Sequence, residues 1–277
     1  MLKQGKVRGF LIAMLILWPL LPAVSAEEQR VELATDVDFA PYISKAHLND
    51  GLLTDIVRQS LKLEGVDLDL LIRPWPRSYR DLELKRIIGT FAWVYSKERE
   101  EKFYLSDVIY IFKHVFISHD SDFRFPSSLH DSSAERTWCY PLGWTIPDFI
   151  RPHIEHYDLR VVNPTSLENC YQLVKTGRAD FTLLPTLTAG HLMKNDSNGV
   201  FLESYPSDVD HNYAHVLFAK TQDGEIMRNL FNRGLSKLIK SGGYRETITA
   251  HLEGAPDEIK DIVLANIDEF ENKNIVE

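Results

Sequence analysis

Two successive series of short β-runs alternating with helical stretches restrict the fold of this sequence more than any other feature. In the first series, VELATD at 31–36, VDLDLLIRPW at 66–75 and IGTFAWVYS at 88–96 have the pattern of strands, and LLTDIVRQSLKLEG at 52–65 that of a helix. Strands and helices that alternate through loops this short predict an α/β unit. A second series starts with TWCYPLGW at 137–144, so the sequence predicts two α/β lobes.

Two longer β-rich runs indicate where the chain crosses between the lobes. VIYIFKHVFISH covers 108–119, and NYAHVLFAK covers 212–220 ahead of further helical stretches. We therefore expect two α/β sandwiches joined by two hinge strands. The expected division is a signal peptide at 1–26, the first part of lobe 1 at 27–112, lobe 2 at 113–210, and a return to lobe 1 with a C-terminal helical tail at 211–277. We expect the tail, from Pro256 onward, to be a surface helix that packs locally.

The first 26 residues have the pattern of a secretory signal peptide. Lys3, Lys6 and Arg8 precede the apolar run FLIAMLILWPLL, and the small residues after it favour cleavage following Ala26. The alternative is an uncleaved membrane anchor, but the apolar run is short beside the roughly 20 residues that cross a bilayer. Removing 1–26 takes away three positive charges and no negative one, so the net charge changes from −9 to −12. That balance argues against nucleic acid as a partner.

The sequence contains two cysteines, Cys139 and Cys170. Thiols of exported proteins oxidise, so a disulfide between the two is the favoured interpretation. Closing a loop of this length stabilises a protein by roughly 3–4 kcal/mol on the chain-entropy model. The alternative is a pair of small buried hydrophobic side chains.

Arg99 is the most suggestive charged residue, because it follows the apolar run at 88–96. In open α/β sheets, ligands bind beyond the carboxyl ends of the strands. A guanidinium is always charged and pairs with a carboxylate through two parallel hydrogen bonds. Arg99 is therefore a candidate carboxylate receptor. The alternative is a surface arginine that pairs with Glu98 or Glu101.

Six motifs in a fixed order resemble those of one protein family. They are TDVDFAPY at 35–42, GLLTDIV at 51–57, GTFAWVYSKERE at 89–100, YLSDVIY at 104–110, PLGWTIPD at 141–148 and GRAD at 177–180. Together they resemble the periplasmic solute-binding proteins of the polar amino acid type, extracellular family three, over roughly 31–250. The resemblance implies the two-lobed type II periplasmic binding fold, which closes on a small solute like a clamshell.

The resemblance also implies roles for particular residues. The family's serine/threonine-x-x-arginine step corresponds to Ser96 through Arg99, which makes Arg99 the receptor for the ligand carboxylate. Gly143 and Thr145, in the family's glycine-threonine loop, are expected to donate from backbone and hydroxyl. Phe39 takes the position of the family's aromatic residue after the first strand. The implied protein is a periplasmic monomer that needs no cofactor and delivers an amino-acid-like solute to an ABC permease in the membrane.

The sequence departs from the family at the positions expected to bind an α-amino group. Pro185 stands where the family usually has an aspartate, and Phe91 and Trp93 replace polar residues of the strand before Arg99. An ammonium left unpaired in a closed site would cost a few kcal/mol. These changes favour an aromatic or extended carboxylate over an ordinary α-amino acid.

Three further residues are candidates for the ligand site. Trp75 and Arg77 follow a strand of the first lobe and would add an aromatic face and a second cation. The alternative is that Trp75 packs in the core and Arg77 begins a helix. Trp144 has the same two interpretations, since one side of its loop is expected to face the ligand and the other the lobe core.

An enzyme is the weaker interpretation. His211 and His215 are four apart, but their context predicts a strand, in which they lie roughly 13 Å apart and cannot bind one metal ion. No G-x-S-x-G, P-loop or H-E-x-x-H motif is present. Dehydratases that resemble cyclohexadienyl dehydratase use the same fold, and Glu98, Asp38 or Asp180 would have to serve as their acid or base. A ligand-sensing adaptor for a membrane signalling protein remains a further alternative.

Overall fold

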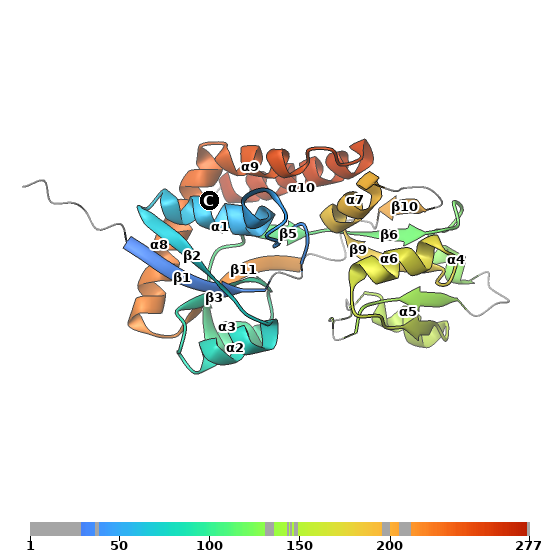
Figure 1. Cartoon of the computed structure of the whole chain (residues 1–277), viewed down its shortest axis with the longest axis horizontal. Coiled ribbons are helices and arrows are strands. Elements are labelled where there is room, and N and C mark those ends of the chain that lie inside the picture. The colour runs from blue at the N-terminus through green and yellow to red at the C-terminus, as the bar shows by residue number, and fades with distance from the viewer. Residues whose placement is uncertain are drawn as a thin grey trace, which may run out of the picture.

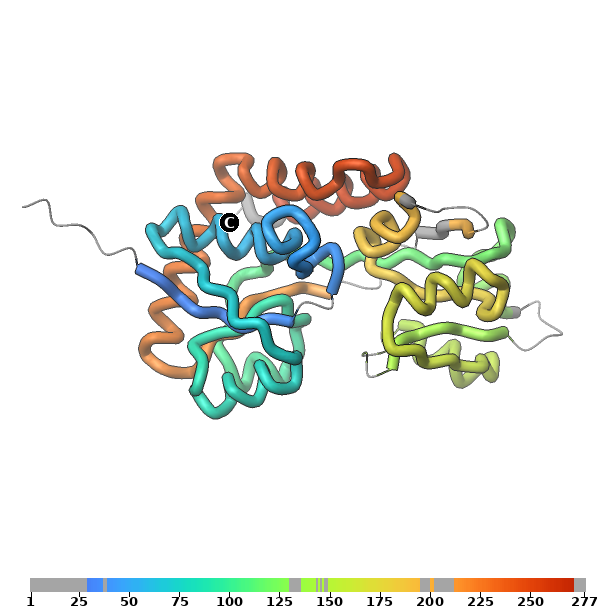
Figure 2. Tube along the Cα trace, viewed as in Figure 1, coloured from blue at the N-terminus to red at the C-terminus, as the bar shows by residue number. Residues whose placement is uncertain are grey.

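The computed structural model describes residues 29–36, 39–130, 136–142, 144, 146, 149–195, 200–204 and 212–275. These residues form two α/β lobes that lie side by side, as the alternating pattern predicts (Figures 1 and 2). The expected signal peptide at 1–26, with its cleavage site after Ala26, lies outside the described residues. Within them, no helix has both the length and the apolar character needed to span a membrane.

Lobe 1 contains a six-stranded sheet in the order β2-β1-β3-β11-β4, with β5 also paired to β11. Its strands are β1 (Gln29–Thr35), β2 (Val66–Ile72), β3 (Gly89–Val94), β4 (Phe103–Leu105), β5 (Tyr110–Phe112) and β11 (Asn212–Ala219). β1 is parallel to β2 and β3, whereas β11 is antiparallel to β3, β4 and β5. Its helices are η1 (Leu48–Asp50), α1 (Leu52–Lys62), α2 (Trp75–Glu83), α3 (Lys97–Lys102), α8 (Gln222–Lys240) and α9 (Gly243–His251).

Lobe 2 repeats this plan with a five-stranded sheet in the order β10-β6-β9-β7-β8. Its strands are β6 (His114–Ser118), β7 (Thr137–Cys139), β8 (Arg160–Val162), β9 (Phe181–Pro185) and β10 (Phe201–Ser204), and its helices are α4 (Ser127–His130), α5 (Arg151–His156), α6 (Leu167–Lys175) and α7 (Thr186–Asn195). In lobe 2 the parallel strands β8, β7 and β9 are bordered by the antiparallel strand β6. In the same way, the parallel strands β2, β1 and β3 of lobe 1 are bordered by the antiparallel strand β11. Both lobes therefore present the carboxyl ends of a parallel trio.

The chain passes from lobe 1 to lobe 2 at Lys113. The β-rich run at 108–119 is two strands, because β5 ends at Phe112 in the first sheet and β6 begins at His114 in the second. Lys113 itself forms a 3.2 Å ion pair with Glu269. The return lies between β10 and β11, outside the described residues. The chain therefore crosses between the two lobes twice.

The core of lobe 1 depends on a close crossing of α1 and α8. Helix α1 buries Leu52, Leu53, Ile56, Val57 and Leu61, whose helical spacing places them on one face. Gly234 of α8 lies against this helix, and a Cβ atom there would stand 1.9 Å from the carbonyl oxygen of Ser60. Only glycine lets the two backbones approach this closely, so the position fixes the distance between α1 and α8.

The C-terminal helix α10 (Asp257–Ile275) does not pack locally, and that expectation is wrong. It buries Ile259, Val263, Ile267 and Phe270 on one face, and it contacts α8 and β5 of lobe 1 as well as α7 of lobe 2. Figure 1 shows α10 running along one side of the molecule toward α7. The apolar stripe from Ile259 to Phe270 continues over about three turns, which is long enough to reach both lobes. This helix therefore connects the lobes in addition to the two crossings.

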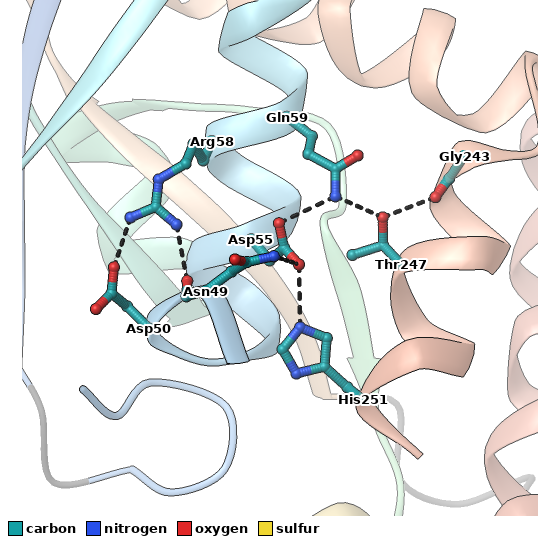
Figure 3. A network of polar contacts seen from close by, with 8 residues as sticks. All are labelled: Asn49, Asp50, Asp55, Arg58, Gln59, Gly243, Thr247 and His251. Atoms are coloured by element: carbon teal, nitrogen blue, oxygen red, sulfur yellow. Dashed lines mark hydrogen bonds and ion pairs between the residues drawn. The ribbon is translucent and has the colours of Figure 1, made fainter. Parts of the chain in front are cut away.

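A buried carboxylate ties α1 to α9. Asp55 of α1 accepts hydrogen bonds from Asn49 (2.9 Å) and Gln59 (3.0 Å) and lies 3.1 Å from Nε2 of His251 (Figure 3). Gln59 also donates to Thr247 of α9. Burial raises the pKa of Asp55, but the hydrogen bonds from its three partners outweigh burial, and the pKa lies below the usual value. The ionised carboxylate of Asp55 thus has a structural role, in which it holds α1 on α9.

Replacing Asp55 by alanine is expected to lower the free energy of unfolding by about 2–3 kcal/mol near neutral pH, since Asn49, Gln59 and His251 lose a charged acceptor. Because the folded pKa is depressed, this contribution is present above the unfolded pKa of about 3.9 and disappears as pH falls through the folded pKa. Urea unfolding measures the change. Asp69→Ala is the control, because its side chain is 54% exposed and its surface pair is worth less than about 1 kcal/mol. Equal losses in both variants would contradict the anion role.

Candidate functional site

Two predicted ligand-site residues, Trp75 and Trp93, lie with Asp36 at the carboxyl ends of β1, β2 and β3. Asp36 follows β1, Trp75 begins α2 directly after Arg73 and Pro74, which link it to β2, and Trp93 lies on β3. The backbone N–H of Trp75 donates to Oδ2 of Asp36 over 3.1 Å. This edge of an open α/β sheet is where ligands bind in such folds.

A β-bulge in β3 decides which side chains face this edge. Trp93 pairs with His215 and Phe91 pairs with Val216, so Ala92 is an extra residue without a partner in the ladder, and its φ is 71°. One extra residue moves the following side chains to the opposite face of the sheet. Phe91 is consequently fully buried in the core and presents no surface to a solute, which corrects its assignment to the site. Trp93 remains partly exposed.

Three aromatic side chains form a cluster at this edge. The ring of Trp93 lies 5.3 Å from that of Trp75 in an edge-to-face arrangement, and 5.3 Å from that of Tyr79. The indole N–H of Trp93 donates to Oγ1 of Thr90 over 3.0 Å, which fixes its orientation. Trp75 and Trp93 were predicted from the sequence. Tyr79 was not, although it lies one helical turn after Trp75 and so shares its face of α2.

Arg99 joins this aromatic cluster. Ser96 caps α3 by accepting from the backbone N–H of Arg99, which sets the first turn of that helix. The guanidinium stacks on the ring of Trp93 at 5.1 Å and donates to the carbonyl oxygen of Val94. Burial lowers the pKa of Arg99, although Tyr79 and Glu98 act in the opposite direction. A partly desolvated guanidinium is a strong receptor for an anion.

The alternative in which Arg99 is paired on the surface does not match the contacts. Glu98 pairs with Lys102 at 2.8 Å and accepts from the Tyr79 hydroxyl at 3.3 Å. Lys102 also pairs with Glu83. Among the residues that the structure describes, no carboxylate lies within ion-pairing distance of Arg99.

Arg77 does not join the cluster. It lies in the first turn of α2, its side chain is 69% exposed, and it pairs with Asp81 at 3.8 Å. Asp81 is a shared partner, since Arg73 and Arg86 also bind it. The interpretation in which Arg77 begins a helix therefore describes the structure, and Arg77 is not part of the aromatic cluster.

The lobe 2 part of the predicted site is only partly described. Gly143 and Thr145 lie outside the described residues, whereas Trp144 between them is described. The ring of Trp144 meets that of Phe39 from lobe 1 edge-to-face at 5.7 Å. Phe39 also packs on Phe112, at the end of the first crossing. Two predicted aromatic residues thus meet between the lobes.

The disulfide anchors the segment that leads to Trp144. Cys139, the last residue of β7, is bonded to Cys170 of α6, as predicted. Both residues are fully buried. The loop at 141–146 therefore starts from a strand end that is covalently fixed to a helix.

Two of the residues considered for catalysis or metal binding, Asp180 and His215, have structural contacts. Asp180 accepts from the backbone N–H of Thr137 (2.7 Å) and from Arg136 (3.2 Å), so it joins two strands of lobe 2. Burial lowers the pKa of His215, whose Nδ1 contacts the carbonyl oxygen of Ser106 at 2.8 Å. Asp38 and His211 lie outside the described residues. In the described part of the chain, no group of three or more potential ligands for a metal ion occurs.

Comparisons with known proteins bear on the fold. No family model and no curated protein matches the sequence. A protein from the glutathione import system of Streptococcus mutans, which involves GshT and the cystine ABC importer TcyBC, has a TM-score of 0.67 and 19% identity, covering 82% of this chain and 96% of the other. An arginine-specific periplasmic binding protein of Salmonella typhimurium has a TM-score of 0.62 and 14% identity, covering 79% and 97%.

A third similar structure is the ligand-binding core of GluR0 from Nostoc punctiforme in complex with L-glutamate, with a TM-score of 0.58, 17% identity, and coverage of 78% of this chain and 96% of that one. At such identities the similarity establishes the fold. The chain has the two-lobed fold of periplasmic solute-binding proteins, which confirms the fold class implied by its motifs. The solved structures with this fold include amino-acid-binding proteins of ABC transporters.

Proposed function

We propose that the protein binds a small solute bearing a carboxylate between its two lobes and closes over it. The observation that carries this proposal is the state of Arg99. Its guanidinium is held on Trp93 at the carboxyl ends of the lobe 1 strands, with no carboxylate partner among the described residues. A half-buried cation held in place by an aromatic face is prepared for an anionic ligand.

Closure completes the site in this proposal. The carboxylate first meets Arg99, and the backbone and hydroxyl donors of Gly143 and Thr145 then reach it from lobe 2. Trp144, already beside Phe39, covers the ligand from the same loop. Contacts that form only when both lobes engage shift the population toward the closed form.

The cluster favours an amino-acid-like or aromatic solute. Trp75, Tyr79 and Trp93 offer faces for an apolar or cationic group. Pro185 is buried in β9, and its side chain has no carboxylate to offer an ammonium group. Asp36 places one beside Trp75 instead. Two similar structures hold amino acids: the GluR0 ligand-binding core is in complex with L-glutamate, and an ancestral arginine-binding protein is bound to arginine.

The proposed setting is the periplasm, after signal peptide cleavage at Ala26, and the proposed receiver is the permease of an amino acid ABC transporter. The similarity to amino-acid ABC proteins supports delivery to a permease, and similarity to the GluR0 ligand-binding core supports a sensing role as the second candidate. The two roles use the same site. A pull-down from membranes of the source cell separates them by the partner retained.

A thermal-shift screen of amino acids, aromatic acids and short peptides tests the proposal. A true ligand at 100 times its dissociation constant is expected to stabilise the protein by about 2.7 kcal/mol. Small-angle scattering with the same ligand is expected to show a more compact molecule, because the lobes close. Incubation without loss of the solute separates binding from turnover. Absence of any shift across carboxylate solutes would refute the proposal.

A further inference from the structure

Helix α7 of lobe 2 makes a second set of contacts with lobe 1, away from Arg99. Thr188 donates to the carbonyl oxygen of Ala40 over 3.0 Å, and the backbone N–H of Leu187 donates to the Tyr42 hydroxyl over 3.3 Å. A Cβ atom added at Gly190 would stand 2.7 Å from Ile259 of α10, so this helix also fits closely there. α7 is therefore the element through which lobe 2 rests on the lobe 1 loop at 39–50.

The same helix carries one of two histidines that touch across this junction. Nε2 of His47, in the lobe 1 loop, lies 3.2 Å from Nδ1 of His191, in α7, and the ring centroids are 4.6 Å apart. A hydrogen bond between two imidazoles needs one nitrogen that donates and one that accepts. A doubly protonated pair has no acceptor and carries two positive charges, so it cannot keep this contact.

Charged groups of the lobe 1 loop, α7 and α9 surround the pair. Lys194 of α7 donates to the carbonyl oxygen of Glu253, so its charge stays at this junction. His251 of α9 is engaged with Asp55, which also binds Asn49 and Gln59 (Figure 3). In the lobe 1 loop, Asp50 is bound by Arg58 at 2.6 Å. Asp50 and Asp55 are thus both already paired within lobe 1.

These charges act on His47 in one direction. Burial lowers the pKa of His47, and electrostatic interactions with His191, His251 and Lys194 lower it further. The neutral form of His47 is therefore favoured while α7 stays in contact with the loop.

We propose that the His47–His191 contact is a proton-sensitive latch between the lobes, which holds α7 on the lobe 1 loop when neutral and releases it when both imidazoles are protonated. The latch links the arrangement of the lobes to the pH outside the cell membrane. It does not depend on the identity of the solute or on Arg99. Its failure would leave the proposed solute binding intact, and the reverse also holds.

The sign of the effect follows from linkage. A histidine whose folded pKa is depressed stabilises the folded form above its unfolded pKa of about 6.5, and this stability is lost as pH falls below that value. Acidification from about pH 8 to about pH 5 therefore weakens the junction in the parent protein. His215 contributes to the total pH dependence, since burial lowers its pKa too. The difference between the parent and a latch variant isolates the latch.

Two measurements on the purified protein test the proposal. In an NMR titration of the histidine side chains, His47 is expected to titrate below about 6.5 and to return toward that value in His191→Gln. In urea unfolding across the same pH range, His47→Gln is expected to lose less stability on acidification than the parent. Unchanged titration of His47 in His191→Gln, or identical pH dependence in parent and variant, would overturn the latch.

A third variant tests the geometry without changing pH. Replacing both histidines, His47→Lys together with His191→Lys, places two permanent cations opposite each other without an acceptor, so the small-angle scattering curve of this variant at about pH 8 is expected to match that of the parent at about pH 5. His156→Lys is the control for an added cation, because His156 lies on α5 and contacts Tyr157 within its own lobe. If the double lysine variant scatters like the parent at about pH 8, two positive charges do not release the lobes and the proposal fails.

Discussion

Arg99→Ala is expected to weaken binding of the solute found in the screen by about 2–5 kcal/mol, which is roughly 30-fold to several thousand-fold in the dissociation constant. The loss is large because the guanidinium is partly desolvated on Trp93, so the ligand carboxylate would be buried without its partner. Titration calorimetry measures it directly. Arg99→Lys keeps the charge without the planar fork and is expected to fall between the parent and the alanine variant.

Arg77→Ala is the matched control for this experiment. Arg77 belongs to the same lobe and lies near the same aromatic cluster in the sequence, but its side chain is exposed and paired with Asp81. Its removal is expected to change the dissociation constant by less than about threefold, as for an exposed pair. If Arg99→Ala keeps the affinity of the parent, or if Arg77→Ala loses as much, the proposed carboxylate contact is wrong.

Removal of the disulfide by Cys139→Ser together with Cys170→Ser is expected to lower the free energy of unfolding by roughly 3–4 kcal/mol, because the bond closes a loop across 31 positions of the chain. The loss falls on lobe 2, since both cysteines lie within it. Urea unfolding with and without a reductant measures it. The fixed end of β7 also leads into the loop that holds Trp144, so the affinity for the solute is expected to fall as well.

The sequence makes this test unambiguous. With two cysteines in the chain, a reductant acts on the parent protein at one bond, and the double serine variant serves as its own control because it has no bond to reduce. The parent with reductant and the variant without it are expected to unfold at the same urea concentration. A parent protein that is indifferent to reductant would contradict the assigned contribution.

Local signals in the sequence were sufficient to predict the helices, the strands and their division into two lobes. Ser166 accepts from the backbone N–H of Asn169 at the start of α6, and Gly177 follows that helix with a φ of 67°, so a local cap and a local stop delimit this helix. Such features depend on a few neighbouring residues, and so does the Ser96 cap that positions Arg99. The aromatic residues Trp75 and Trp93 could be placed at the strand ends for the same reason.

Features that depend on distant contacts were missed. The bulge at Ala92 turns Phe91 into the core and Trp93 outward, and it arises from pairing with β11, more than a hundred residues away. The packing of α10 on lobe 2 involves α7, whose sequence TLTAGHLMKN gives a weak helical pattern. Arg77 was predicted as a ligand-site residue because it is close to Trp75 in the sequence, whereas in the structure it pairs with Asp81. In each case a tertiary partner overrides the local pattern.

The antiparallel strand β11 determines the order in which the two lobes can fold during synthesis. Lobe 2 draws all its strands from one uninterrupted stretch, β6 to β10, and can be assembled as soon as that stretch has emerged. Strands β4 and β5 wait for residues 212–219, their partner in the sheet, long after they themselves have been made. The half of the protein that is begun first is therefore finished last, and it is the half that holds Arg99.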